Sequence, residues 1–337
     1  MILPMNIHMK QSKTFVFLSF CILLLASITG CRNQKVTEIS KQGFLFDTFI
    51  SIQLYNTEDT ELLEEAFQIC SAYEQKLSRT IPTSEIAQIN AAKGTPVVVS
   101  SDTYTLIETG IQYGELSQGS FDITIAPLSQ LWDFKNNTGM IPDTDALQSA
   151  SALVDYQTIV LDPATSSVSL TNPQAMIDLG GIAKGFIADQ VKEFLLANDI
   201  TYGIINLGGN VLTIGTKPDG LPYQVGIQKP FSDNGVPFTT LEITDQSIVT
   251  SGIYERYIEV ADVRYHHILD PQTGMPIEND LLSVTIVSDS STAGDALSTI
   301  CMTKGLKNGM QLIESIPNTE ALFITSDYEV HKSSGLS

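Results

Sequence analysis

The chain has 337 residues and carries 38 aspartates and glutamates against 18 lysines and arginines, a formal net charge of −20 at pH 7. A surface of this sign repels phosphate backbones, so the composition argues against a nucleic-acid partner. A small anionic ligand would need local help from a metal ion, a lysine or backbone amides. The length suits one large domain or two closely packed ones.

The first thirty residues have the pattern of a secretory signal peptide. Lys10 and Lys13 form a basic start, residues 15–25 are apolar, and the sequence Ile-Thr-Gly precedes Cys31. The apolar run is too short for a permanent membrane-spanning helix. Because a cysteine at this position resembles the lipobox of bacterial lipoproteins, we expect residues 1–30 to be a lipoprotein signal peptide. Lipidated Cys31 would then hold the protein at the extracytoplasmic face of the bacterial cell membrane; the alternative is an ordinary signal peptide with an incidental cysteine.

Two of the four cysteines, Cys21 and Cys31, belong to this signal and lipidation region. The other two, Cys70 and Cys301, lie in segments with helical patterns. One disulfide between them is an alternative in an oxidising compartment, but we expect two buried free thiols. The absence of CxxC or cysteine–histidine ligand spacing argues against a structural zinc site.

The first half of the mature chain reads as a polar tether followed by strand and helix patterns. Residues 31–42 are polar, and we expect them to link the lipidated cysteine to a single catalytic domain of residues 43–337. Alternation of apolar residues predicts a first strand at 49–55. Apolar residues at helical spacing predict three helices. The first covers residues 57–78, the second begins after an N-cap at Thr83 or Ser84, and the third covers residues 101–116.

The second half of the chain is richer in strands. Helices are predicted at 183–197 and 291–303, the second ending at Lys304-Gly305. Since strands and helices do not alternate regularly, we expect an α+β fold of mixed or antiparallel sheets with packed helices. The predicted strands are 175–177, 203–206, 223–227, 248–250, 257–260 and 282–287.

Residues 178–185, Asp-Leu-Gly-Gly-Ile-Ala-Lys-Gly, are a candidate ligand-binding turn. A strand is expected to end at Asp178, the glycines permit a tight turn, and a helix begins with Lys184 in its first turn. Free amides, a helix N-terminus and a cation together suit an anionic ligand. A turn that only lets the helix pack on a sheet explains the glycines equally well. The glycine pair within residues 206–210 is likewise explained by a bulge or tight turn.

Two further segments carry polar groups suited to catalysis or metal binding. His266 and His267 are adjacent in a predicted strand and point to opposite faces, so one can look into a cleft; a lone histidine is more often structural. Asp295 and Thr299 are four residues apart and share one helix face. A carboxylate with a hydroxyl suits Mg²⁺, which also takes water and phosphate ligands. An aspartate near a helix start is, however, favoured by the helix dipole alone.

Seven motifs in this chain follow the order found in one protein family, and together they are highly specific. The chain closely resembles the ApbE family, the bacterial FAD:protein FMN transferases, from about Gly43 to Thr325. The motifs are LSRTIPTSEIAQIN (77–90), GSFDITIAPLSQLW (119–132), IDLGGIAKGFIAD (177–189), INLGGN (205–210), TSGIYERY (250–257), HHILDPQTG (266–274) and AGDALST (293–299).

This resemblance implies that FAD is a substrate, that FMN is transferred to a threonine hydroxyl of an exported acceptor protein, and that AMP is released. By similarity, Asp295 and Thr299 would bind Mg²⁺ with the backbone carbonyl of Gly181, and Ser298 lies close enough to assist. His267, which begins the family motif H-I-x-D-P, would act as the base on the acceptor hydroxyl. FAD contacts would come from Asp178, Lys184, Ser120, Phe121, Asp122 and the backbone around Ile268.

Two departures from the family pattern concern FAD binding. Phe46-Asp47-Thr48 stands where many members have Met-Gly-Thr, with the methionine against the flavin ring. Phe46 is therefore expected to stack on the isoalloxazine. Thr80 stands where many members have an aromatic residue, so the resemblance supplies no second ring contact there. Both changes bear on FAD affinity more than on the phosphoryl chemistry.

Two other functions remain open on the sequence. The same metal site could direct water at FAD and give FMN and AMP, and acceptor dependence of AMP release would separate this hydrolysis from transfer. The chain could also bind flavin without turnover, but that function gives no purpose to Asp295 and Thr299. The resemblance suggests exported FMN-binding-domain proteins of electron-transport systems as acceptors.

Overall fold

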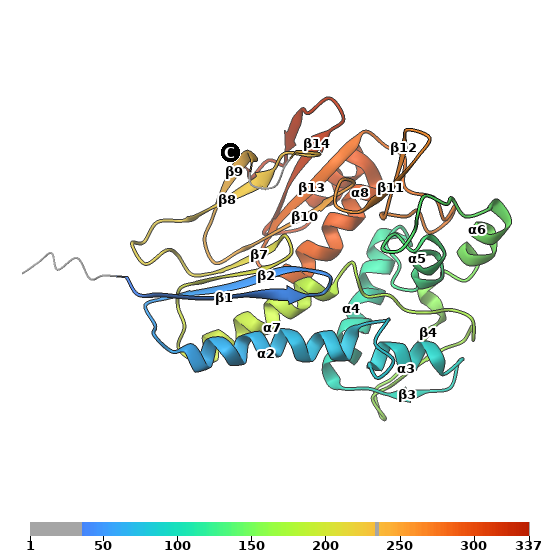
Figure 1. Ribbon diagram of the computed structural model, residues 1–337, viewed down its shortest axis with the longest axis horizontal. Helices are drawn as coiled ribbons and strands as arrows, with labels where there is room; N and C mark the ends of the chain where they lie inside the picture. The colour runs from blue at the N-terminus through green and yellow to red at the C-terminus, as the bar shows by residue number, and fades with distance from the viewer. Residues whose placement is uncertain (1–35, 233–235, 337) are drawn as a thin grey trace, which may run out of the picture. The chain divides into compact units, whose positions relative to one another are not determined.

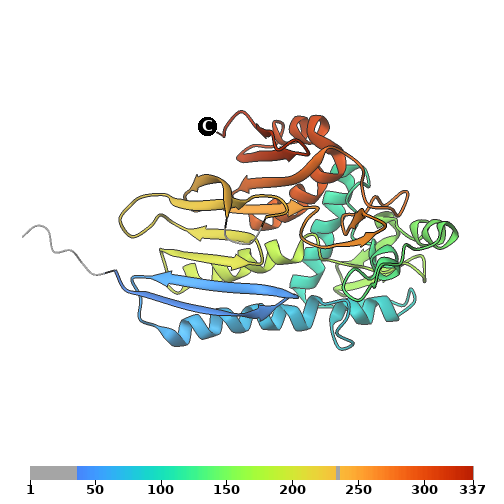
Figure 2. The same cartoon turned by 45° about the horizontal axis from the view of Figure 1, so that its top comes forward.

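An eight-stranded sheet, antiparallel throughout, forms the centre of the structure (Figures 1 and 2). The computed structural model describes residues 36–232 and 236–336, and from Glu38 onward the chain forms one compact unit. Residues 1–30 and Cys31 lie outside the described residues. In sheet order the strands are β1 (Glu38–Leu45), β2 (Thr48–Tyr55), β6 (Gly203–Leu207), β7 (Asn210–Ile214), β10 (Ser247–Gly252), β13 (Leu281–Ser288), β14 (Thr319–Thr325) and β15 (Val330–Lys332).

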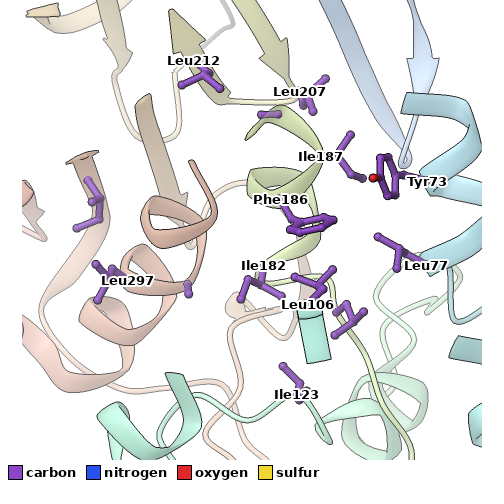
Figure 3. Packing of buried hydrophobic residues seen from close by; sticks show 14 of the residues in the cluster. Tyr73, Leu77, Leu106, Ile123, Ile182, Phe186, Ile187, Leu207, Leu212 and Leu297 are labelled. Atoms are coloured by element: carbon purple, nitrogen blue, oxygen red, sulfur yellow. The ribbon is translucent and has the colours of Figure 1, made fainter. Parts of the chain in front are cut away.

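Three long helices cover one face of this sheet and bury the main core. α7 (Ala183–Ala197) packs against both α2 (Thr60–Leu77) and α8 (Ser291–Ile313). Figure 3 shows the side chains that α7 contributes to this core, and Phe186 meets Tyr73 of α2 edge-on at 5.8 Å. Burial of these apolar side chains stabilises the fold by about 25 cal/mol per Å². Within the described residues, no helix is long and apolar enough to cross a lipid bilayer.

The opposite face of the sheet is covered by a hairpin of β8 (Tyr223–Gln228) and β9 (Pro237–Ile243). Its apolar residues form a second core with side chains from β10, β13 and β14. Because both faces are covered, every residue of β13 is buried. This sandwiching explains why even Ser283 and Thr285, which alternate with the apolar residues of 282–287, are buried.

A third, smaller core joins β11 (Tyr257–Val260) and β12 (Val263–His266) to α5 (Ala126–Trp132) and α6 (Thr144–Ser151). The Trp132 ring stacks on Tyr265 at 5.8 Å, and its Nε1 donates to the Gly274 carbonyl at 2.8 Å. These contacts fix the segment that follows β12. The remaining elements are α3 (Glu85–Ala91), α4 (Ser101–Ser117), the 3₁₀ turn η1 (Tyr156–Thr158) and the small sheet of β3 (Val97–Val98), β5 (Ser167–Leu170) and β4 (Ile159–Asp162).

Most of the predicted elements are present, and the α+β class is confirmed. α7 has the predicted bounds. Ser84 caps α3, its Oγ accepting a hydrogen bond from the Ala87 amide at 2.9 Å. Cys70 and Cys301 are buried free thiols as expected, and burial raises the pKa of each to about 12.

Two sequence predictions were wrong. The first strand is β1, so residues 38–42 belong to the sheet rather than to a tether. Its exposed positions are Glu38, Ser40, Gln42 and Phe44, and its inner positions include Lys41 and Gly43, so no regular apolar alternation marks this edge strand. Residues 175–177 are not a strand, because Met176 makes only an isolated bridge to Ile125. The predicted stop of the helix at Lys304-Gly305 is confirmed: Gly305 has a non-helical backbone (φ 72°, ψ 171°), and α8 consists of two helical stretches that meet at this kink.

Candidate active site

The N-terminal turns of α7 and α8 lie against each other and form the centre of the candidate site. At Gly185 the backbones are so close that a Cβ atom would collide with the Ser291 carbonyl oxygen, so only glycine fits. Asp189, one turn later in α7, accepts hydrogen bonds from Ser290 Oγ and from the Ser291 and Thr292 amides at 2.8–2.9 Å. Sequence reasoning gave Asp189 no role, although it closes the glycine-turn motif.

Asp295 reaches from α8 to the start of α7. Its side chain is 5% exposed. Oδ2 accepts a hydrogen bond from the Gly185 amide at 3.0 Å, and Oδ1 lies 3.7 Å from Lys184 Nζ. A helix N-terminus and a cation both stabilise a carboxylate. Ser298 is fully buried and shares a 2.7 Å hydrogen bond with Ser251 of β10. Its hydroxyl therefore supports the α8–sheet contact.

The structure also brings Gly181 and Thr299 together. A Cβ atom on Gly181 would lie 3.7 Å from Thr299 Oγ1, and the Thr299 hydroxyl lies 3.5 Å from the Asp295 carbonyl oxygen. In the part of the chain that the structure describes, no cluster of three histidine, cysteine, aspartate or glutamate residues could hold a metal ion alone. One carboxylate, one hydroxyl and one carbonyl are nevertheless hard oxygen donors that fit Mg²⁺ if water and phosphate oxygens complete its shell.

The glycine turn is held by an ion pair that sequence reasoning missed. Asp178 Oδ2 lies 2.9 Å from Nε of Arg79, and its Oδ1 accepts a hydrogen bond from the Gly180 amide at 2.9 Å. Both side chains are partly buried. The arrangement adds a second cation, Arg79 of the LSRT motif, to the turn that already carries Lys184. The predicted contact of Asp178 with FAD stays a prediction.

The segment of residues 120–122 has a largely structural geometry. Asp122 accepts hydrogen bonds from the Thr124 amide and hydroxyl at 2.7 and 2.6 Å and from the Tyr156 amide at 2.8 Å. Burial raises the pKa of Asp122, although these bonds oppose the rise. Its two oxygens therefore fix the loop.

Phe121 is the member of this segment nearest the glycine turn. Its ring lies 3.1 Å from where a Gly181 Cβ would stand. Ser120 donates from Oγ to the Ser117 carbonyl at 3.2 Å. The predicted FAD contacts of Ser120, Phe121 and Asp122 stay predictions, and Phe121 has the most direct geometry for one.

His267 is held by one backbone carbonyl. Its amide nitrogen and its ring Nδ1 each lie 3.1 Å from the Arg256 carbonyl oxygen. Because a carbonyl only accepts, Nδ1 carries the proton and Nε2 keeps a lone pair. Burial lowers the pKa of His267 to about 4, and the nearby charges of Arg256 and Lys184 add to this effect. The ring is therefore neutral near pH 7.

The neighbours of His267 point to other partners. His266 is buried, and its Nε2 lies 3.1 Å from the Ile277 carbonyl oxygen, to which it can donate. The Ile268 carbonyl accepts from the Ile277 amide at 3.0 Å. Ile268 is thus a buried anchor of the segment, and its predicted backbone contact with FAD stays a prediction.

Lys184 connects the two halves of the site. It pairs with Asp295, and its charge acts on both His267 and Glu255. Glu255 is reachable by solvent, yet the surrounding protein costs its charged form hydration and raises its pKa to about 7; Lys184 and Arg256 oppose this rise and Asp295 adds to it. Lys184, Asp295, Glu255 and His267 therefore belong to one site, in which the charge of Lys184 acts on the other three. Glu255 is a further residue that sequence reasoning missed, although it lies in a quoted motif.

Phe46 lies at the turn of the β1–β2 hairpin. Phe46 and Asp47 both have left-handed backbones (φ 55° and 58°), as a two-residue hairpin turn requires. Phe46 is half-buried, and its amide donates to Glu74 Oε1 at 2.6 Å. The expected stacking on flavin stays a prediction. The glycine pair of residues 206–210 is the β6–β7 turn, with φ 65° at Gly208 and 99° at Gly209, so its structural interpretation holds.

The described residues also form an open pocket of about 480 Å³ between α2 and α7, lined by Ile69, Tyr73 and Phe194 among others. The predicted site residues are not among those that line it. The candidate site is therefore defined by side-chain chemistry and contact, not by this pocket.

Fold and site together define an α+β protein with a glycine turn that carries Arg79 and Lys184 beside the N-termini of two helices, and with a neutral histidine on which the charge of Lys184 acts. The ApbE family model matches residues 46–323, and the chain belongs to the ApbE family.

Several known proteins are similar along most of the chain. A FAD:protein FMN transferase of Treponema pallidum is 33% identical over 97% of this chain and 96% of that protein. One from Klebsiella pneumoniae is 36% identical over 88% of this chain and 92% of its own. The crystal structure of the ApbE protein of Thermotoga maritima has a TM-score of 0.81 at 28% identity, covering 88% of this chain and 97% of that one. Flavin transferase ApbE from Vibrio cholerae gives 0.77 at 27% identity, with 89% and 98% covered.

Proposed function

We propose that this protein is a FAD:protein FMN transferase, the activity that its relatives carry in their names. The site has the parts that such a reaction needs: a cationic glycine turn, oxygen donors for a divalent cation and a neutral histidine. The observation that carries the proposal is the position of Lys184. It lies 3.7 Å from Asp295 and acts electrostatically on His267, so the phosphate-binding groups and the candidate base belong to one site.

In the proposed reaction, a threonine hydroxyl oxygen of an exported acceptor attacks the phosphorus on the FMN side of the FAD pyrophosphate. A phosphoester bond to threonine forms, the bond to the bridging oxygen breaks, and AMP leaves. The hydroxyl proton passes to His267 Nε2. The Arg256 carbonyl, 3.1 Å from Nδ1, fixes the tautomer that leaves Nε2 free for this step.

Asp295, Thr299 and the Gly181 carbonyl would hold Mg²⁺, which when bound neutralises charge on the pyrophosphate. Lys184 and the α7 N-terminus add fixed positive charge on the same side. Since phosphoryl transfer needs little covalent chemistry, placing these charges is the main task of the protein. Phe46, at the β1–β2 turn, is proposed to stack on the flavin ring.

We also propose that the protein is a lipoprotein anchored through Cys31 at the extracytoplasmic face of the membrane. The support is the signal-peptide pattern with a cysteine after Ile-Thr-Gly. A Cys31→Ala variant expressed in a bacterium is expected to leave the membrane fraction and lose radiolabelled fatty acid. A variant that stays lipidated would contradict this assignment.

The function is tested with residues 32–337, FAD, Mg²⁺ and an exported FMN-binding-domain protein. We expect a fluorescent acceptor band in a denaturing gel, a mass gain equal to FMN on an acceptor threonine, and loss of both with EDTA. AMP and free FMN without labelling of a panel of such acceptors would indicate a FAD pyrophosphatase. Bound FAD without AMP would indicate a flavin-binding lipoprotein.

A further inference from the structure

The chain reaches its compact unit at one end of the central sheet. β1 starts at Glu38, which is paired with Tyr55, the last residue of β2. The Tyr55 amide donates to the Tyr202 carbonyl at 3.1 Å, one residue before β6 starts. We call the region around Glu38, Tyr55 and Tyr202 the anchor end, because the segment that follows the proposed lipid anchor joins the unit here.

β1 and α2 run side by side from the anchor end to the candidate active site (Figures 1 and 2). Lys41 pairs with Glu64 in the first half of both elements. Phe46, just after β1, donates its amide to Glu74 near the end of α2. Two residues after α2 ends, Arg79 holds the glycine turn. Both elements therefore start at the anchor end and finish at the site.

α7 covers the same distance in the opposite direction. Lys184 of the site is in its first turn, and residues 198–202 join its C-terminal end to Gly203 of β6. Gly203 is paired with Leu54, next to Tyr55 at the anchor end. The 15 residues of α7, at 1.5 Å each, give it a length of about 22 Å, so the site lies about this far from the anchor end.

The segment between the proposed lipid anchor and the unit is short compared with this distance. Glu38 is the seventh residue after Cys31, whose lipid would lie in the bilayer. Seven residues average about 15 Å in a random coil and reach about 25 Å when fully extended. The anchor end is therefore held close to the bilayer, whereas the site could approach it only if the segment were almost fully extended.

Charge does not pull the site toward the bilayer. The chain has a net charge of −20, so anionic lipid headgroups repel its surface. The two cations of the glycine turn, Arg79 and Lys184, are each paired with an aspartate. The covalent link at the anchor end therefore decides which end of the unit faces the lipid.

We propose that the anchor end faces the lipid bilayer and that the candidate active site stands about 22 Å farther from the lipid surface. The inference rests on the proposed lipid anchor at Cys31 and not on the identity of the acceptor. It adds a condition to the proposed function: an acceptor in the same membrane has to present its threonine at this height above the bilayer, not at the lipid surface.

Two side chains of similar exposure mark the two ends of the unit. Leu221 is 58% exposed and lies two residues before Tyr223, whose ring contacts that of Tyr55 at 6.3 Å between centroids. Phe44 is 60% exposed, near the end of β1 and two residues before Phe46 at the hairpin turn. Leu221→Cys and Phe44→Cys therefore give a matched pair of positions for a fluorescent label.

The test measures energy transfer from this label, on the lipidated protein, to a headgroup dye in phosphatidylcholine vesicles. Cys70 and Cys301 are buried and the Cys31 sulfur carries the lipid, so the introduced cysteine alone takes the label. We expect at least about twice as much transfer from Leu221→Cys as from Phe44→Cys, because their mean heights differ by about 20 Å. Residues 32–337, which lack the lipid, should show no transfer from either position.

The outcomes separate this inference from the proposed function. Equal transfer, or more from Phe44→Cys, overturns the orientation, and so does transfer from unlipidated residues 32–337, because another face would then bind lipid. Leu196→Cys, 48% exposed at the C-terminal end of α7, is a second anchor-end position and should agree with Leu221→Cys. A Cys31 without lipid, read from the mass of the protein, overturns the anchor and this inference together. Failure of acceptor labelling in solution, by contrast, overturns only the proposed transfer.

Discussion

The two sides of the candidate active site are built in different ways. On the α7–α8 side, Asp295 is buried against Gly185, and Asp189 binds the first turn of α8 through several hydrogen bonds. On the β11–β12 side, Glu255 and Arg256 are exposed, and His267 is held through a single carbonyl. One side is a rigid junction of two helices, and the other is an open hairpin surface.

This difference matches what each substrate would need in the proposed reaction. Charge stabilisation of a pyrophosphate is most effective from groups that are fixed before the reaction, because no reorganisation is then required. A protein acceptor must enter with its own backbone, so the side that receives it has to be open. We therefore expect substitutions on the helix junction to affect the chemical step most, and substitutions on the hairpin to affect acceptor use.

The largest effect is expected for Asp295→Asn. The asparagine can still accept from the Gly185 amide, which lies 3.0 Å from Oδ2, but the negative charge beside Lys184 is lost. Mg²⁺-dependent AMP release should fall by about 10³-fold or more while the melting temperature changes little. Assays of AMP with and without EDTA, beside a thermal melt, check this. Full activity in this variant would remove Asp295 from the metal set.

The next effect is expected for His267→Gln. Transfer should fall by about 10²-fold, the lower range for loss of a general base, while FAD affinity stays unchanged because Lys184 and the glycine turn remain. Titration of flavin fluorescence and initial rates of labelling separate the two quantities. Equal losses of both would assign His267 to FAD binding.

The pH dependence follows from the same histidine. A base must be unprotonated, and the pKa of His267 is lowered to about 4 by burial. As far as protonation of His267 is concerned, the transfer rate should stay constant as the pH falls from 7 to about 5 and drop only near pH 4. A plot of kcat/KM for FAD against pH, compared with the His267→Gln variant, checks this. A drop centred near the ordinary histidine pKa of about 6.5 would contradict the buried environment.

Local features of the site were predictable from sequence, whereas tertiary partners were not. The start of α7 and the cap at Ser84 depend on glycines, a hydroxyl and periodicity within a few residues. Asp295 and Thr299 were recognised through their helical spacing and the family motif. The contact between Asp295 and the Gly185 amide joins residues 110 positions apart, which no local pattern contains.

The missed features have the same cause. β1 is an edge strand with Lys41 and Gly43 on its inner face and Phe44 on its exposed face, so it shows no regular apolar alternation. Ala175 and Ile177 are buried without being part of a strand, and Met176 makes only an isolated bridge to Ile125. Asp122 belongs to the family motif, yet its oxygens are used by Thr124 and Tyr156. Hydrogen-bond partners of this kind become visible only when the chain is folded.

A smaller effect is expected for Asp189→Asn. An amide at this position brings a donor group toward the hydroxyl and amide donors of Ser290, Ser291 and Thr292, so part of the cap on α8 is lost, at a cost of about 1–2 kcal/mol. We expect a lower melting temperature and about a tenfold weaker affinity for Mg²⁺, measured as a higher half-saturating Mg²⁺ concentration. Glu259→Gln, on the open hairpin, is the matched control and should alter neither quantity.

The smallest effect is expected for Arg79→Gln. Arg79 pairs with Asp178 at 2.9 Å, and both side chains are partly exposed, so the pair contributes at most about 1 kcal/mol to stability. Because Arg79 lies at the glycine turn, its positive charge should also favour binding of the anionic FAD pyrophosphate there. The KM for FAD should rise about threefold to fivefold. Lys192→Gln removes a comparable ion pair, in which Lys192 Nζ lies 2.8 Å from Asp245 Oδ1. Lys192 is on α7, the helix that follows the glycine turn, but it lies away from the start of that helix. A rise in KM for Arg79→Gln and none for Lys192→Gln would place Arg79 on the rigid, phosphate-binding side; equal behaviour would leave its ion pair as a support of the loop only.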